Sequence, residues 1–280
     1  MPATDETTPD GHRHSRNEGF FGADGQTQIA ATPVAIVGLG GLGSHVAQQL
    51  GYLGTQSFAL IDHDDVTESS MNRVVTADDG DAAAGVLKVD AAKRRLLAIN
   101  PAARVTSVPV RLNDEAAFEA IAEAKVVFGC VDNDFARVQL TRICSELAIP
   151  LIDLATDVDV KANPMTFGGR VVCCTGDGCL VCLGVLDQHA LALANMTDEQ
   201  AQAYERIYGI SRDALGQTGP MVVSINGTVA SLAVTEFIAL VTRVAPGDPR
   251  AQLPRPPRCH RQERRPATRG LLVLRRSLGQ

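Results

Sequence analysis

A glycine-rich turn at positions 38–43 constrains the fold of this chain more than any other feature. It reads Gly-Leu-Gly-Gly-Leu-Gly, follows an apolar run at 33–37, and precedes small and apolar residues at helical spacing over 42–53. A buried parallel strand, a tight turn and a helix produce this pattern. Glycine lets the backbone approach a ligand closely. The turn and the start of the helix are therefore expected to hold phosphate groups through Gly38, Gly40, Gly41 and Gly43.

Strand and helix patterns alternate around this turn. The expected strands lie at 33–37, 57–61, 104–110, 126–130 and 150–154. The expected helices lie at 42–53, 86–99, 114–124, 135–147 and 222–241. The alternation predicts an α/β fold, with a Rossmann-like, mostly parallel sheet and helices on both faces. The pattern at 158–174 predicts antiparallel strands that extend the sheet at its C-terminal end.

The chain is expected to have three parts. Residues 1–30 form a polar N-terminal arm, and residues 31–245 form one domain that contains a polar, mobile crossover segment at about 187–220. The remaining residues, 246–280, include nine Arg and six Pro, which predicts an extended or disordered basic tail. Such a tail is either simply solvated or a binding site for an anionic partner. It reflects either divergence or a change of reading frame near residue 245.

Composition excludes several classes of protein. The 280 residues are 45% hydrophobic and 21% charged, which is ordinary for a folded domain and excludes dominant disorder. We find no apolar run approaching about 18 residues and no apolar segment near the N-terminus, so we expect no membrane span, no secretory signal and a cytoplasmic location. Outside the tail the chain is acidic, which disfavours nucleic acid as a partner.

Asp62 ends the second expected strand, 24 residues after Gly38. An acid at that place in a βαβ unit holds ribose hydroxyls, so the sequence predicts a nucleotide site. A dinucleotide oxidoreductase is the default class for this pattern. However, the polar residues after Asp62 suit a triphosphate with Mg²⁺ better, because cations neutralise phosphate oxygens and carboxylates hold the metal. These residues are Asp64, Asp65, Asn72, Arg73 and Lys88. In the helix at 86–99, we expect exposed positions for Lys88, Lys93, Arg94 and Arg95.

Short motifs succeed one another along most of the chain. They are Arg-His-Ser-Arg-Asn at 13–17, the glycine turn, Asp-His-Asp-Asp-Val at 62–66, Ser-Ser-Met-Asn-Arg-Val at 69–74, Gly-Val-Leu-Lys at 85–88 and Val-Asp-Asn at 131–133. With these motifs the chain resembles the ThiF/MoeB/HesA family, relatives of the ubiquitin-activating enzymes. The resemblance runs from about residue 13 to residue 239.

The resemblance implies an activity and a set of site residues. The domain at 31–245 would use ATP to adenylate the C-terminal glycine carboxylate of a small ubiquitin-like or sulfur-carrier protein, releasing pyrophosphate. The implied catalytic residues are Arg16, Arg73, Lys88 and Asp132, with Asp132 binding Mg²⁺. The implied ATP ligands are Gly38, Gly40, Gly41, Gly43, Asp62, Asn72, Arg73, Lys88 and Asn133. Arg16 would reach the nucleotide of the neighbouring subunit in a homodimer.

Elementary chemistry agrees with these roles. A C-terminal carboxylate has a pKa near ~3.5 and is already an anion at neutral pH, so it needs no general base. The obstacle is to bring this anion to the α-phosphorus of a polyanion, and aligned cations and a metal ion lower that obstacle.

The chain also departs from the family pattern. Ser70 stands where the family usually has Asn, and Val74 replaces a common Gln. Cys179 and Cys182 match the first of two zinc-binding CxxC pairs, but the region of the second pair has only Cys259, followed by His260. Zinc binding through Cys179 and Cys182 is therefore an expectation that requires a substitute ligand, for which Cys173 or Cys174 is a candidate.

The cysteines also limit the steps that could come after adenylation. The segment 187–219 has no cysteine, so no thioester or persulfide step is expected on the crossover segment. Cys130 and Cys144 lie in the interior of an expected strand and helix and are predicted to be core thiols.

Two other functions stay open. The same chemistry could act on a short peptide or on a tRNA nucleoside carboxylate. The chain could also be a non-catalytic, nucleotide-binding scaffold, which the change at Ser70 and the missing cysteines favour and the retained charged residues disfavour.

Overall fold

The computed structural model describes residues 13–159, 166–176, 178–186, 191–192, 196–208, 220–244 and 271–277. Within these ranges one sheet has seven strands in the order β3-β2-β1-β4-β5-β6-β7. Their bounds are β1 Val34–Val37, β2 Ser57–Ile61, β3 Arg104–Val108, β4 Val126–Gly129, β5 Leu151–Asp159, β6 Thr166–Cys174 and β7 Leu271–Ser277. Pairing is parallel from β3 to β5 and antiparallel for β5–β6 and β6–β7. The predicted fold class is confirmed.

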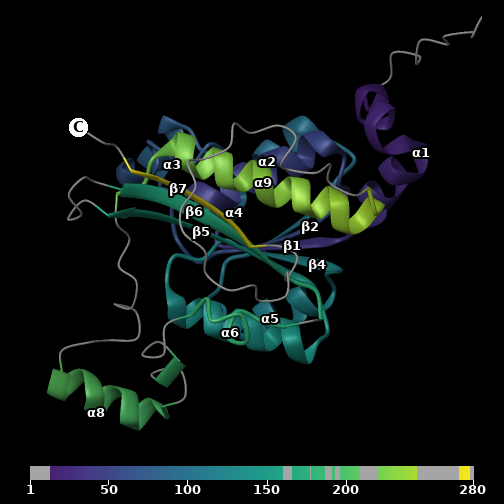
Figure 1. Ribbon diagram of the computed structural model, residues 1–280. Coiled ribbons are helices and arrows are strands. Elements are labelled where there is room, and N and C mark those ends of the chain that lie inside the picture. The colour runs from purple at the N-terminus through teal and green to yellow at the C-terminus, as the bar shows by residue number, and fades with distance from the viewer. Residues whose placement is uncertain are drawn as a thin grey trace, which may run out of the picture.

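Helices cover both faces of the sheet, as predicted (Figure 1). Figure 1 shows α2, α4 and α9 on one face and α5 and α6 on the other. The bounds are α1 Ser15–Ala31, α2 Gly41–Leu53, α3 Asp79–Ala84, α4 Lys88–Ile99, α5 Glu115–Ala122, α6 Asp134–Glu146, α8 Asp198–Tyr208 and α9 Val223–Thr242, with a short 3₁₀ turn, η1, at Glu68–Ser70. Two apolar cores result, one on each side of the sheet.

The strand order positions the site. The chain enters the sheet at β1 and continues outward through β2 to β3, and it then returns to the other side of β1 as β4. Loops that leave the carboxyl ends of β1 and β4 therefore diverge to opposite faces. A crevice opens between such loops, and in open α/β sheets this crevice is where ligands bind.

Much of the N-terminal arm is helical, which the sequence analysis did not predict. From Ser15 onward it is helix α1, which packs on α9 and buries Ile29 completely. The low hydrophobicity of the segment concealed this helix, because only a few of its side chains are buried. Gly22, at φ 77°, interrupts the helical backbone and marks a kink.

The basic tail also differs from the sequence prediction. Residues 271–277 form β7, which pairs antiparallel with β6 from Thr166↔Ser277 to Val172↔Leu271. The expectation of disorder is therefore wrong for this strand. Its apolar residues 271–274 were outweighed in the sequence prediction by the Arg and Pro around them. The rest of the tail lies outside the described residues.

Helix α9 is a longer apolar segment than the sequence analysis expected anywhere in the chain. It has 20 residues and a mean hydropathy of 1.5, so by length and composition it could cross a membrane. Its contacts are those of a core helix, since it packs against α1, α2, β5 and β6 and buries Phe237 completely. Of the predicted crossover segment, residues 191–192, 196–208 and 220 are described, and Figure 1 shows α8 standing apart from the sheet.

Candidate nucleotide site

A cavity of about 650 Å³ opens at the carboxyl ends of the parallel strands. Eight of the residues predicted for the site line it: Gly38, Gly40, Gly41, Asp62, Arg73, Lys88, Asp132 and Asn133. Among the predicted residues, Gly43, Asn72, Arg16, Cys179 and Cys182 are not part of its lining. The cavity therefore brings together the glycine turn and four charged side chains that are far apart in the sequence.

The glycine turn requires glycine for two different reasons. Gly38 has φ 89°, and a Cβ there would lie 2.6 Å from the carbonyl oxygen of Cys130. A Cβ at Gly43 would collide with the carbonyl oxygen of Gly38, so the turn and the first turn of α2 could not close. Gly40 has no atom within 4 Å of its missing Cβ. Gly38 and Gly43 thus shape the turn, whereas Gly40 leaves space at the cavity.

Asp62 is fixed at the junction of β2 and the glycine turn. Its Oδ2 accepts a hydrogen bond from the Leu39 amide at 2.6 Å, and its Oδ1 accepts one from the Asp64 amide at 2.9 Å. Burial raises the pKa of Asp62, although Lys88 and the two amides act in the opposite direction. This geometry holds the carboxyl group at the end of β2, beside the glycine turn, which is the position from which an acid can bind ribose hydroxyls.

Lys88 lies in the cavity rather than on the surface, so the expectation of an exposed position is wrong. Its Nζ lies 2.7 Å from Oδ2 of Asp64, and the side chain is 12% exposed. The backbone amide of Lys88 also donates to the Asp64 carbonyl oxygen at 3.0 Å. Burial acts to raise the pKa of Asp64, but the ion pair with Lys88 outweighs it and holds that pKa below its usual value.

The other cations of α4 have different surroundings. Arg94 is exposed as predicted and pairs with Asp81, while Arg95 donates to Gln48 at 2.9 Å. Lys93 and Arg95 are partly buried, which corrects their predicted exposure. None of these three cations lines the cavity. Lys88 is thus distinct from its neighbours on the helix.

Arg73 reaches the cavity from the loop that follows η1. Its Nη1 donates to the Ser69 carbonyl oxygen and, at 3.1 Å, to Oδ1 of Asn72. Asn72 is exposed and does not line the cavity, so its contact is with Arg73. Ser70, which replaces the usual Asn, is buried and bonded to Thr67, where it forms part of the N-terminal cap of η1.

Asp132 and Asn133 follow β4. Asp132 is exposed in the cavity, and its Oδ1 accepts a hydrogen bond from Nδ2 of Asn133 at 3.2 Å. The side-chain oxygen of Asn133 accepts from the Ala136 amide at 2.8 Å and so caps the start of α6. Asn133 therefore orients the carboxylate of Asp132, which is suited to bind a hard cation such as Mg²⁺.

A buried ionic cluster was missed in the sequence prediction. Asp153 on β5 is fully buried, with Nε of Arg137 at 3.3 Å and Nη2 of Arg170 at 4.0 Å. Arg137 also donates to the carbonyl oxygens of Val131 at 2.6 Å and Leu154 at 3.1 Å. Both arginines line the cavity. Arg137 thereby ties the loop after β4 to β5 and supports the wall that presents Asp132.

Arg16 and the CxxC pair lie elsewhere. Arg16 is exposed on α1 and does not contribute to the cavity of its own chain. The Sγ atoms of Cys179 and Cys182 lie 3.4 Å apart in a turn. In the described part of the chain, the one group of three or more possible metal ligands is Asp62, His63 and Asp64. The described residues thus supply two ligands of a tetrahedral zinc site, and zinc binding stays a prediction.

The thiols are expected to differ sharply in reactivity. Burial raises the pKa of Cys144, Cys173 and Cys174 to about 12 each, and it also raises the pKa of Cys130. Hydrogen bonds from Cys179 hold the pKa of the exposed Cys182 below its usual value. Since the thiolate is the nucleophile, iodoacetamide at pH 8 with EDTA should label Cys182 first and the buried thiols only after unfolding.

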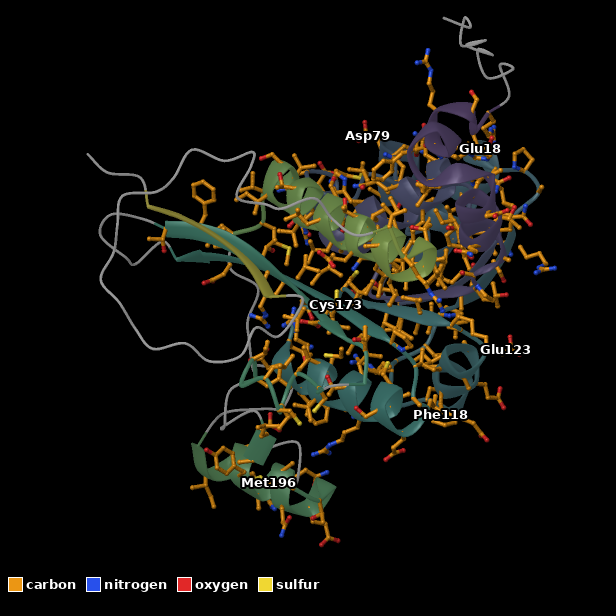
Figure 2. The ribbon with its side chains drawn as sticks, turned by 45° about the vertical axis from the view of Figure 1, so that its right-hand side comes forward. Glu18, Asp79, Phe118, Glu123, Cys173 and Met196 are labelled. Atoms are coloured by element: carbon orange, nitrogen blue, oxygen red, sulfur yellow. The ribbon has the colours of Figure 1, made fainter. Side chains whose placement is uncertain are left out.

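Peptide mass spectrometry against time gives the order of labelling. Early modification of Cys130 or Cys144 in the native protein would contradict their prediction as core thiols. Figure 2 shows Cys173 on the sheet beside α9, where it is partly buried, in keeping with slow labelling there.

The sequence model of the ThiF family matches residues 14–266. The chain therefore belongs to the ThiF family. Among curated relatives, the sulfur carrier protein ThiS adenylyltransferase of Escherichia coli is 34% identical over 165 residues, 57% of this chain and 61% of that protein. The molybdopterin-synthase adenylyltransferase of Haemophilus influenzae is 37% identical over 129 residues, 46% of this chain and 52% of that protein. The chain thus matches little more than half of the length of these relatives.

Solved structures agree on the fold. A crystal structure of Escherichia coli MccB with ATP gives a TM-score of 0.61 at 22% identity, covering 84% of this chain and 65% of that chain. MccB in complex with N-formylated MccA gives 0.64 at 22% identity, covering 84% and 66%. PaaA gives 0.58 at 23% identity, covering 87% and 78%. These likenesses show the same fold around the cavity.

Proposed function

We propose that this protein is an ATP-dependent adenylyltransferase that activates the C-terminal carboxylate of a ubiquitin-like or sulfur-carrier protein as an acyl-adenylate. The observation that carries the proposal is the single cavity that gathers the glycine turn, Asp62, Arg73, Lys88 and Asp132. Membership of the ThiF family and the names of the relatives, which include a sulfur-carrier protein adenylyltransferase, support this reaction.

The residues of the cavity have separable tasks in this reaction. Asp62 orients the ribose, and the amides of the glycine turn hold phosphate oxygens. Arg73 and Lys88 neutralise the triphosphate, and Mg²⁺ at Asp132 would add charge stabilisation there. The incoming carboxylate is already ionised, so no side chain has to remove a proton from it. The released product is pyrophosphate.

Two alternatives keep some support. A short peptide fits as the acceptor because MccB, which shares the fold, has been solved with a peptide-like partner, N-formylated MccA. A nucleotide-binding scaffold fits the change at Ser70. A tRNA carboxylate receives less support, since the chain outside the tail is acidic.

ATP–pyrophosphate exchange separates these functions. Labelled pyrophosphate should enter ATP only when the correct acceptor is present, so the assay is run with ThiS ending in glycine, with short peptides and with tRNA. ThiS without its terminal glycine is the matched control. Exchange with short peptides but not with ThiS would show that the acceptor is a peptide and not a sulfur-carrier protein. Nucleotide binding without exchange for any of these acceptors would favour the scaffold.

We also propose a homodimer in which Arg16 completes the site of the neighbouring subunit. Arg16 lies exposed on α1, outside the cavity of its own chain, and Phe20 on the same helix is 67% exposed. Mixing Arg16→Ala with Asp132→Ala subunits should restore about a quarter of wild-type exchange, because half of randomly assembled dimers are mixed and each has one intact site. A monomer in sedimentation, or no recovery in the mixture, would contradict this arrangement.

The proposal also includes a cytoplasmic location of the protein and the binding of zinc. The cysteines of the described residues are all free, which fits a reducing, cytoplasmic compartment. Zinc, if bound, would use Cys179 and Cys182, with Cys173 or Cys174 as the candidate for a further ligand. Burial raises the pKa of Cys174, and the charges of Cys179 and Cys182 raise it further, so Cys174 lies in their neighbourhood.

A further inference from the structure

Asn226 is a buried polar side chain with an unused donor. It lies near the start of α9, is 1% exposed and lines the nucleotide cavity. Its Oδ1 accepts a hydrogen bond from Oγ1 of Thr156 at 3.3 Å, whereas its Nδ2 has no hydrogen-bond partner. Buried amide donors are almost always paired, because an unpaired one has lost its water without compensation. An unpaired donor at a cavity wall points to a ligand that supplies the acceptor.

The position of the donor identifies the group that it would meet. A Cβ on Gly41 would collide with Nδ2 of Asn226, so this NH₂ group lies against the first residue of α2. The start of α2 is the place where free backbone amides and the helix dipole attract an anion. The donor and these amides therefore converge on the same anionic group.

The two faces of the sheet separate Asn226 from the charged cluster. Thr156 pairs with Gly169, and a Cβ on Gly169 would collide with Val229 of α9, so this pair faces α9. The neighbouring pair, Ala155 and Arg170, faces the other way, because side chains alternate along a strand. Asn226 thus lies on the same side of the sheet as the glycine turn.

We propose that Asn226 is a further nucleotide-binding residue, whose side-chain NH₂ donates to an α-phosphate oxygen of ATP. The α-phosphate is the phosphate attached to the ribose, and Asp62, the ribose residue, is bonded to Leu39, two residues before Gly41. Thr156 is the positioning residue, since its hydroxyl holds Oδ1 and directs Nδ2 toward Gly41. This assignment rests on the proposed use of ATP. It adds a contact to the α-phosphate, whose phosphorus atom the acceptor attacks.

Two substitutions separate binding from folding. Asn226→Leu keeps the shape but removes the donor, and it also removes the buried unpaired group, so the melting temperature of the ligand-free protein should be kept or raised. Asn226→Asp keeps the shape and places a carboxyl group against the phosphate. Asn100→Asp is the matched control, because Asn100 is also a buried Asn but donates to the Thr55 carbonyl oxygen and does not line the cavity.

The measurement is the dissociation constant of AMPCPP by calorimetry, with adenosine titrated by ligand-observed NMR as the phosphate-free probe. We expect AMPCPP to bind at least about tenfold more weakly to Asn226→Leu, the usual loss for a hydrogen bond to a charged group, and more weakly still to Asn226→Asp. Adenosine should bind all variants equally, and Asn100→Asp should bind AMPCPP like the wild type.

Three results would overturn the assignment. Wild-type AMPCPP affinity in Asn226→Leu and Asn226→Asp would remove Asn226 from the site while leaving the proposed function intact. An equal loss of adenosine and AMPCPP affinity would mean that Asn226 supports the nucleoside part of the site or its packing. Failure of the wild-type protein to bind AMPCPP would refute the proposed function and this assignment together.

Discussion

Replacing Asp132 by alanine should abolish Mg²⁺-dependent ATP–pyrophosphate exchange while the protein stays folded. Asp132 is an exposed carboxylate in the cavity, directly after β4 and oriented by Asn133. Without it the metal ion loses its clearest ligand. A loss of about 4 kcal/mol of charge stabilisation would lower the rate about 10³-fold, at about 1.4 kcal/mol per tenfold.

The fold should survive because the structural work at this corner is done by Asn133, which caps α6, and by Arg137, which ties the loop to β5. A melting temperature close to that of the wild type checks this. Glu123→Ala is the control for removing an acid elsewhere, since Figure 2 shows Glu123 at the surface near α5. Near-normal exchange in Asp132→Ala, with the Mg²⁺ dependence unchanged, would remove Asp132 from the site.

Replacing Lys88 by alanine should lower kcat by about 10²–10³, the usual effect of removing one preorganised donor. The KM for ATP should change far less. Negative charge moves toward the leaving pyrophosphate as the reaction proceeds, so an ammonium group held there binds the transition state more strongly than the ground state. The structure adds that Lys88 is already held in place by Asp64, at 2.7 Å.

Lys93→Ala on the same helix is the matched control, because Lys93 does not line the cavity. Lys93 is partly buried but lies outside the cavity, so its replacement should leave the rate within about twofold. Equal, near-wild-type rates for the two variants would show that Lys88 has no part in the reaction. A large rise in the KM for ATP with kcat unchanged would instead assign Lys88 to ground-state binding.

The elements that could be predicted from the sequence are those determined by residues that are close together in the chain. Glycines 38–43 require a tight turn, and the alternation of apolar strands and helices determines a parallel sheet, so the frame of the cavity could be predicted directly. Asp62 was placed for the same reason, since an acid at the end of the second strand faces the turn. Lys88 was placed in the site by a motif, while its predicted exposure was wrong because the helical pattern does not show the loop at Asp64 that covers it.

The residues that were missed depend on contacts between distant elements. Asp153, Arg137 and Arg170 lie on β5, α6 and β6, and no spacing in the sequence shows that they meet. Asn226 resembles an ordinary polar position of a helix until its burial and its contact with the glycine turn are known. Strand β7 was missed for a different reason, since the composition of the tail concealed its apolar stretch.

The ion pair of Lys88 with Asp64 has a consequence for how fast ATP arrives. Lys88 pairs with Asp64, and Arg137 pairs with Asp134 and Asp153. Five carboxylates of the lining also balance its five cations; the carboxylates are Asp62, Asp64, Asp132, Asp134 and Asp157, and the cations are Arg73, Lys88, Arg111, Arg137 and Arg170. The cavity therefore presents little uncompensated positive charge to an approaching polyanion, and long-range attraction adds little to the association rate. ATP then binds when its phosphate groups replace the present side-chain partners of these cations at contact distance. The association rate constant for ATP therefore depends only weakly on ionic strength.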